Sequence, residues 1–174
     1  MADFTLILGG ARSGKSRLAE AHLLAAAAGR APLYIATAQP LDAEMRARIA
    51  KHRAQRDGAG WRTQEAPLAL ADALDQTPAE APVLIDCLTL WLSNHLLAGS
   101  DLPQEGARLA RAIAARPAPL IAVANEVGWG IVPENALARR FRDEAGRLNQ
   151  HLAAQAGRVI LVAAGLPLAL KGSL

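Results

Sequence analysis

The chain has 174 residues, a formal net charge of +3 at pH 7, and 52% hydrophobic against 20% charged residues. This length and composition are typical of one globular domain with a sizeable core, and they exclude a largely disordered chain. The mild basic excess contains no basic run interleaved with aromatic residues, so we expect no nucleic acid partner.

Short, dense apolar runs predict buried parallel strands at residues 4–8, 33–37, 83–86, 120–124 and 159–163, with 61–65 as a weaker edge strand. Helices are predicted between them at 15–28, 41–56, 68–73, 88–97, 104–115 and 134–156. Because strands and helices alternate, we expect an α/β fold with a mostly parallel sheet and helices on both faces. No stretch resembles an interdomain linker, so residues 1–174 are predicted to form one domain.

Other sequence features bound the class of protein further. Cys87 is the only cysteine, which excludes an internal disulfide and a cysteine-rich zinc site. No apolar run approaches the ~18–20 residues that span a bilayer, and the first residues lack a basic leader. We therefore expect a cytoplasmic protein with no membrane span.

A glycine-rich loop after the first predicted strand matches the phosphate-binding pattern G-x-x-x-x-G-K-[ST]. Its residues are Gly9, Gly10, Ala11, Arg12, Ser13, Gly14, Lys15 and Ser16. With a strand before it and a helix after it, this loop predicts a nucleoside triphosphate bound by backbone N–H groups and a helix N-terminus. Lys15 should contact the β- and γ-phosphates, and the Ser16 hydroxyl should coordinate Mg²⁺. The alternative is a chance match in a glycine-rich turn.

A carboxylate at the end of a neighbouring strand would complete such a magnesium site. Asp86 directly follows three apolar, β-favouring residues at 83–85, so we predict a metal-linked role for it. The alternative is an aspartate that only caps the following helix.

His52 lies on the predicted helix 41–56, where it continues an apolar stripe formed by Leu41, Met45 and Ile49. Its cationic neighbours are Arg48, Lys51, Arg53 and Arg56. Nearby positive charge disfavours the imidazolium form, and a neutral imidazole can attack a phosphorus atom. Helix geometry alone nevertheless favours a partly buried structural histidine. No pair of histidines has metal-ligand spacing, so zinc is not predicted.

Asn125 and Glu126 leave the predicted strand 120–124 and enter a loop with two glycines. Polar groups at the carboxyl end of a parallel strand face the ligand crevice of an open α/β sheet. We therefore predict a substrate loop, with a structural turn capped by these two side chains as the alternative.

Seven sequence blocks cover nearly the whole chain. They are GGARSGKS (9–16), YIATA (34–38), DAEMRARIAKHRAQR (42–56), WRTQE (61–65), LIDCLTLWLSN (84–94), NEVGWGIVPEN (125–135) and FRDEAGRLNQHLA (141–153). Together they resemble the bifunctional cobinamide kinase / cobinamide-phosphate guanylyltransferase family of the cobalamin pathway. The resemblance implies a P-loop NTPase-type, RecA-like fold.

The resemblance also implies two reactions. ATP or GTP phosphorylates adenosylcobinamide, and GTP then transfers GMP to adenosylcobinamide phosphate through a guanylyl-histidine, giving adenosylcobinamide-GDP. The family's nucleophile falls on His52, and Lys15 is the second expected catalytic residue. Where some members carry another histidine directly before the nucleophile, this chain has Lys51.

Guanine-nucleotide contacts implied by the resemblance extend beyond the P-loop. They fall on Ala36, Thr37, Ala38, Arg53, Ala54, Gln55, Arg56, Glu65 and Asp86. A homotrimer with sites between subunits is also implied. Two alternatives stay open from the residues alone: a P-loop small-molecule kinase without a covalent step, and a nucleotide-dependent regulatory ATPase.

Overall fold

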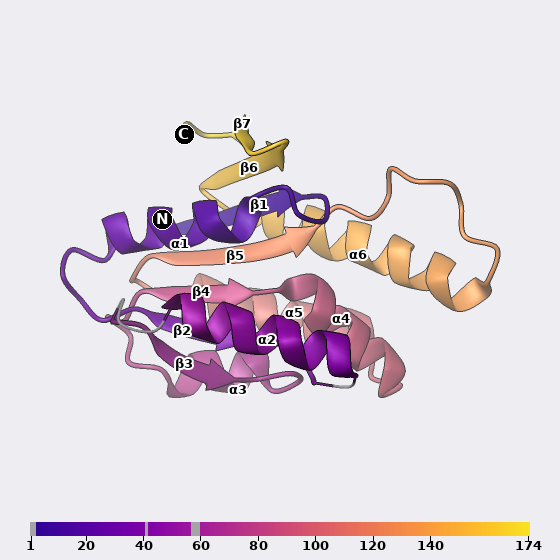
Figure 1. Cartoon of the computed structure of the whole chain (residues 1–174), viewed down its shortest axis with the longest axis horizontal. Helices are drawn as coiled ribbons and strands as arrows, with labels where there is room; N and C mark the ends of the chain where they lie inside the picture. Colours follow the sequence, from indigo (N-terminus) through magenta and orange to yellow (C-terminus); the bar gives the residue numbers. More distant parts are fainter. Residues whose placement is uncertain (1–2, 41, 57–59) are drawn as a thin grey trace.

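The computed structural model describes residues 3–40, 42–56 and 60–174, and its centre is a seven-stranded sheet of order β3-β2-β4-β5-β1-β6-β7 (Figure 1). The strands are β1 Phe4–Gly9, β2 Leu33–Ala36, β3 Arg62–Glu65, β4 Val83–Asp86, β5 Leu120–Asn125, β6 Arg158–Ala163 and β7 Leu166–Lys171. The helices are α1 Lys15–Ala26, α2 Ala43–Arg56, α3 Leu70–Gln76, α4 Leu88–Leu97, α5 Leu102–Ala114 and α6 Ala136–Gln155. Every predicted element is present, with ends that differ by a few residues.

Strands β1 to β6 pair with one another in parallel, which confirms the predicted mostly parallel sheet. Strand β7 was not predicted, and it runs antiparallel to β6. The two strands are joined by Ala164 and Gly165, both with positive φ, as a tight two-residue hairpin turn requires. β7 lies at the sheet edge and exposes Leu166, Leu168 and Leu170, so it lacks the dense buried run that identifies the inner strands.

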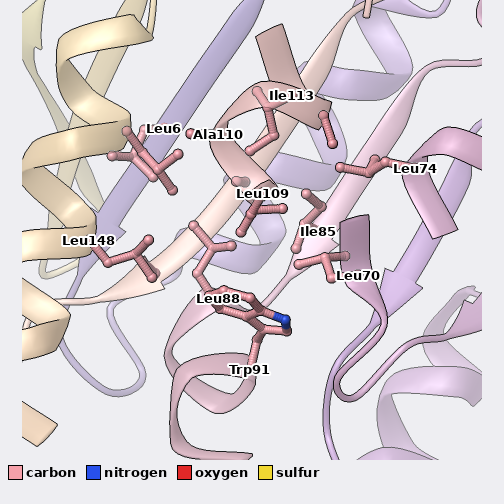
Figure 2. Packing of buried hydrophobic residues seen from close by; sticks show 14 of the residues in the cluster. Leu6, Leu70, Leu74, Ile85, Leu88, Trp91, Leu109, Ala110, Ile113 and Leu148 are labelled. Carbon is pink, nitrogen blue, oxygen red and sulfur yellow. The ribbon is translucent and has the colours of Figure 1, made fainter. Parts of the chain in front are cut away.

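Two hydrophobic clusters form the core, one on each face of the sheet. The larger cluster joins residues of α3, α4, α5 and α6 to the sheet, and Figure 2 shows Leu109 and Leu88 of the helices packed with Trp91 and with Ile85 of β4 among its members. The smaller cluster packs Leu23 of α1 against Ile7, Leu84 and other residues of the opposite face. Helices α1 and α2 lie in front of the sheet in Figure 1, and α4, α5 and α6 lie behind it.

The strand order places the functional loops together. The chain leaves β1 inside the sheet and enters β2 three positions away, because β4 and β5 lie between them. In an open α/β sheet, a crevice forms at the carboxyl ends of the parallel strands where the strand order reverses. Within the described residues, no helix is both long and apolar enough to cross a membrane.

Candidate active site

A pocket that is partly open to solvent lies at this crevice. The residues that line it are Lys15, Ser16, Tyr34, Ala36, Ala38, Met45, Ile49, His52, Arg53, Asp86, Cys87, Leu90 and Asn125. The pocket therefore combines the P-loop, the ends of β2, β4 and β5, and one face of α2.

The P-loop connects β1 to α1 as the sequence predicts. Gly14 has a φ of 95° and Arg12 a φ of 56°, so the loop curls through left-handed conformations. A Cβ atom on Gly9 would lie 2.6 Å from both Ser13 Oγ and the carbonyl oxygen of Val162. Only glycine fits there, because a side chain would collide with the neighbouring strand β6.

Lys15 stands at the start of α1 with a side chain that is almost fully buried. Its ammonium donates a 2.9 Å hydrogen bond to the carbonyl oxygen of Gly10. The N-cap residue of α1 is Gly14, which offers no side-chain cap to the first N–H groups. Ser13 Oγ is buried and has no hydrogen-bond partner among the described residues. A buried cation beside an uncapped helix N-terminus is suited to bind a phosphate group.

Asp86 ends β4 and faces the pocket beside Lys15 and Ser16. Its Oδ2 accepts a 2.7 Å hydrogen bond from the hydroxyl of Tyr34 on β2. Burial, and to a smaller extent the charge of Asp86, raise the pKa of the adjacent Cys87 thiol to about 11. The thiol is therefore protonated at neutral pH, and it is a packing group rather than a nucleophile.

Helix α2 presents His52 to the pocket together with Met45 and Ile49. This is the predicted stripe, although Leu41 lies outside the described residues. The helix begins at Ala43. The residue before it, Asp42, accepts a 2.7 Å hydrogen bond from the Met45 backbone N–H through its Oδ1. The apolar stripe thus lines a cavity instead of the core.

Arg53 also lines the pocket, and its guanidinium contacts the carboxylate of Glu65 at the end of β3. Both side chains are more than half exposed. Glu65 itself is not a lining residue, and Ala54 is exposed. The side chains of Gln55 and Arg56 lie outside the described part of the chain.

The segment after β2 supplies Ala36 and Ala38 to the lining. Thr37 between them is fully buried. Its hydroxyl donates to the carbonyl oxygen of Cys87 at 2.7 Å and accepts from the Cys87 amide at 2.9 Å. The Thr37 side chain thus fastens the end of β2 to the end of β4.

Asn125 lines the pocket at the end of β5, where its backbone N–H donates a 2.7 Å hydrogen bond to Thr89 Oγ1. Glu126 is not among the lining residues. Its Oε1 accepts a hydrogen bond from the Gly128 amide at 2.7 Å. Of the two predicted loop residues, the structure brings only Asn125 to the pocket, and Glu126 shapes the turn.

Sequence reasoning missed several residues of the pocket. Tyr34, Cys87 and Leu90 line it without having been assigned a role. A signal for Tyr34 was present, because it lies two residues before Ala36 and side chains alternate along a strand. Cys87 and Leu90 follow Asp86 within one turn, but nothing in their residue types indicates a site.

Comparison with known proteins identifies the family of the chain. Residues 5–170 match the family model described as cobinamide kinase / cobinamide phosphate guanyltransferase. The chain belongs to this family. It is therefore a cobinamide kinase and cobinamide phosphate guanylyltransferase of adenosylcobalamin biosynthesis. This activity excludes the alternative of a nucleotide-dependent regulatory ATPase.

Two curated relatives and one solved structure place the chain within this family and fold. The bifunctional adenosylcobalamin biosynthesis protein CobP of Pseudomonas aeruginosa is 54% identical, with 96% of each chain covered. The protein CobU of Salmonella typhimurium is 46% identical, over 95% of this chain and 98% of its own. The ATPase domain of G40P has a TM-score of 0.51 at 13% identity, over 92% of this chain and 69% of its own, and supports the RecA-like fold alone.

Proposed function

We propose that one pocket of a single domain serves both transfers of the family, and that His52 is the nucleophile that carries the guanylyl group. The observation that supports this most directly is the meeting of His52 and Lys15 in one pocket, although they come from different helices. A nucleotide bound by the P-loop thus shares its pocket with an imidazole.

In the kinase step, the aminopropanol hydroxyl of adenosylcobinamide attacks the γ-phosphorus of ATP or GTP. A new oxygen–phosphorus bond forms, the bond to the β-phosphate oxygen breaks, and the hydroxyl proton is released. Lys15 offsets negative charge on the leaving diphosphate, which is the role of this lysine in P-loop enzymes.

In the guanylyl step, an imidazole nitrogen of His52 attacks the α-phosphorus of GTP. A nitrogen–phosphorus bond forms and pyrophosphate leaves with the electron pair of the broken bond. A phosphate oxygen of adenosylcobinamide phosphate then attacks the guanylyl-histidine, which releases His52 and forms adenosylcobinamide-GDP. Lys15 serves the same purpose in both steps, because each leaving group carries the β-phosphate.

Ser16 and Asp86 are the residues that would hold Mg²⁺, and both line the pocket. Bound Mg²⁺ neutralises charge on the phosphate oxygens. At phosphate sites this ion keeps several waters and takes only one or two protein ligands. The described residues contain no cluster of three histidine, cysteine or acidic side chains that could hold a metal.

The guanine nucleotide is proposed to contact the P-loop residues, Ala36 and Ala38, and the α2 segment 53–56, while the buried Thr37 holds the end of β2 against β4. Glu65 is proposed to contact the guanine base, because a carboxylate accepts hydrogen bonds from the N–H donors at the edge of guanine. The corrinoid is proposed to approach from the loop that begins at Asn125 and Glu126.

This loop also supports the proposal that the enzyme works as a homotrimer with sites between subunits. In the loop, Trp129 is 76% exposed, Ile131 is 98% exposed and Val132 is exposed as well. The loop projects from the body between β5 and α6 (Figure 1). An apolar cluster of this kind on a projecting loop is typical of a surface that another chain covers.

A covalent adduct tests the function. The protein is incubated with GTP and Mg²⁺, and peptide mass spectrometry should find GMP on His52, with label from α-labelled GTP that is labile in acid and stable in base. His151→Ala is the matched control, since this histidine is exposed on α6, and it should still be labelled. Label that persists in His52→Ala would exclude His52 as the nucleophile.

The residues alone left open a P-loop small-molecule kinase without a covalent step. Such a kinase does not account for the guanyltransferase activity of the family to which the chain belongs.

A further inference from the structure

Tyr34 is a buried pocket residue with no role in the two steps described above. It precedes Ala36 by two positions on β2, so the two side chains share a face of the sheet. Ala36 pairs with Asp86, and Tyr34 pairs with Leu84. Tyr34 is therefore the diagonal neighbour of Asp86 across the β2–β4 pair, a separation that a long aromatic side chain can span.

The phenol spans it with a hydrogen bond from the Tyr34 hydroxyl to Asp86 Oδ2, at 2.7 Å. This length is ordinary for an O–H···O hydrogen bond, and hydrogen bonds from a hydroxyl to a carboxylate are among the stronger ones in proteins. The bond also restricts the carboxylate, because the terminal torsion of an aspartate is otherwise broad.

The donor itself is held in place. Tyr34 is only 4% exposed and packs in the smaller core cluster beside Leu84 and Leu23. The ring of Trp61 meets it edge-on, with centroids 6.0 Å apart and an interplanar angle of 86°. A ring enclosed in this way keeps its hydroxyl at one position, so it can fix the orientation of a partner.

We propose that Tyr34 is a positioning residue that holds the Asp86 carboxylate in the orientation needed for the Mg²⁺-bound nucleotide. This rests on the metal-linked role proposed for Asp86. Residues that hydrogen-bond a metal-linked carboxylate change metal affinity or activity by ~10–100-fold when they are replaced. The competing explanation is that Asp86 merely satisfies a buried hydroxyl.

Tyr34→Phe removes only the hydroxyl, and it separates these explanations. The variant should need about 10-fold more Mg²⁺ for half-maximal GTP binding in calorimetric titrations. Glu144→Gln is the control, because Glu144 pairs with Arg147 on α6 and does not line the pocket. An unchanged Mg²⁺ requirement in Tyr34→Phe, or an equal rise in Glu144→Gln, would overturn the proposal.

A double-mutant cycle with Asp86→Asn makes the test sharper. If Tyr34 acts through Asp86, adding Tyr34→Phe to Asp86→Asn should weaken Mg²⁺-dependent binding no further. Fully additive effects would refute the proposal. If Asp86→Asn itself leaves the Mg²⁺ requirement unchanged, the metal-linked role of Asp86 fails, and the role of Tyr34 fails with it. A loss in Asp86→Asn without any loss in Tyr34→Phe refutes the role of Tyr34 alone.

The composition of the chain allows a direct readout that does not depend on activity. Tyr34 is the only tyrosine, so incorporation of 3-fluorotyrosine gives a single ¹⁹F signal. That signal should differ between the wild-type protein and Asp86→Asn without ligand, and Mg²⁺ with GTP should shift it in the wild type more than in Asp86→Asn. Identical signals and shifts in the two proteins would show that the bond does not couple the phenol to the site.

Discussion

The guanidinium of Arg53 contacts the carboxylate of Glu65, and this ion pair joins helix α2 to the edge strand β3. The two residues come from two sequence blocks, and each was predicted to contact a guanine nucleotide. Their contact holds Glu65 beside helix α2, which carries both Arg53 and His52.

Replacing Glu65 should affect nucleotide binding far more than stability. The side chains are 53% and 59% exposed, and exposed ion pairs contribute only ~0–1 kcal/mol to folding. A charged hydrogen bond to guanine contributes ~1.5–3 kcal/mol, so Glu65→Gln should raise the KM for GTP about 10-fold or more. Steady-state kinetics and urea unfolding measure the two quantities.

Glu144→Gln provides the matched control, since Glu144 pairs with Arg147 on α6, away from the pocket. It should leave the KM for GTP unchanged. An equal KM for GTP in wild type and Glu65→Gln would contradict the guanine role of Glu65.

Lys15 and His52 should separate the two activities. Lys15→Ala removes the buried cation from the phosphate site, and it should lower both transfers by about 100-fold or more. His52→Ala should abolish guanylyl transfer and retain most of the kinase activity, because the γ-phosphoryl transfer does not use the imidazole. The two products are assayed separately, and equal losses of both activities in His52→Ala would contradict this division.

Adjacent glycines of the P-loop should tolerate alanine differently. In Gly9→Ala the new Cβ meets Ser13 Oγ and the Val162 carbonyl oxygen at 2.6 Å, whereas at Gly10 it meets nothing within 4 Å. Overpacking costs ~1–3 kcal/mol, so Gly9→Ala should lower the free energy of unfolding by about that amount and Gly10→Ala by less. Urea unfolding of both variants measures the difference, and equal losses would show that the close contact at Gly9 does not limit the loop.

Cys87 should react slowly with alkylating reagents while the protein is folded. Its thiol is buried and has a pKa of about 11, raised from 9.0 first by burial and then by Asp86. The folded state therefore disfavours the thiolate. The free energy of unfolding should be unaffected by this group below pH 9 and should fall as the pH rises from 9 to 11.

The measurement for Cys87 is the rate of modification by iodoacetamide against pH. Because Cys87 is the only thiol, the rate for the folded protein should increase about tenfold per pH unit up to the raised pKa. A rate that levels off near pH 9 would contradict the shift.

Arg116 should be a major contributor to stability outside the pocket. Its guanidinium donates to the carbonyl oxygens of Leu74, Thr77, Pro78, Ala79 and Ala81, over distances of 2.9–3.5 Å. Arg116→Met leaves buried carbonyl groups without their donor and should lower the free energy of unfolding by about 3 kcal/mol. Chemical denaturation measures the loss, with Arg111→Met on the exposed side of α5 as the control. Equal losses in the free energy of unfolding of the two variants would contradict the stabilising role of Arg116.

Much of the fold could be predicted because its strands are buried on both faces. Such strands are short continuous apolar runs, and each is bounded by a glycine, a proline or a polar residue. β7 escaped prediction because an edge strand alternates exposed and half-buried residues and contains Pro167. The ends of the helices differed because capping contacts, such as that of Asp42 with the Met45 amide, form only in the folded chain.

The sequence by itself determined the phosphate-binding loop, since the spacing of its glycines, Lys15 and Ser16 is local to one turn of backbone. It also identified the candidate carboxylate Asp86 and the candidate nucleophile His52 as separate segments. Only the tertiary structure decided that they share one pocket, that Thr37 is buried at its edge, and that Tyr34 holds Asp86. The physical reason is that these contacts join strands and helices far apart in the chain, and no local pattern encodes which side chains meet at the ends of parallel strands.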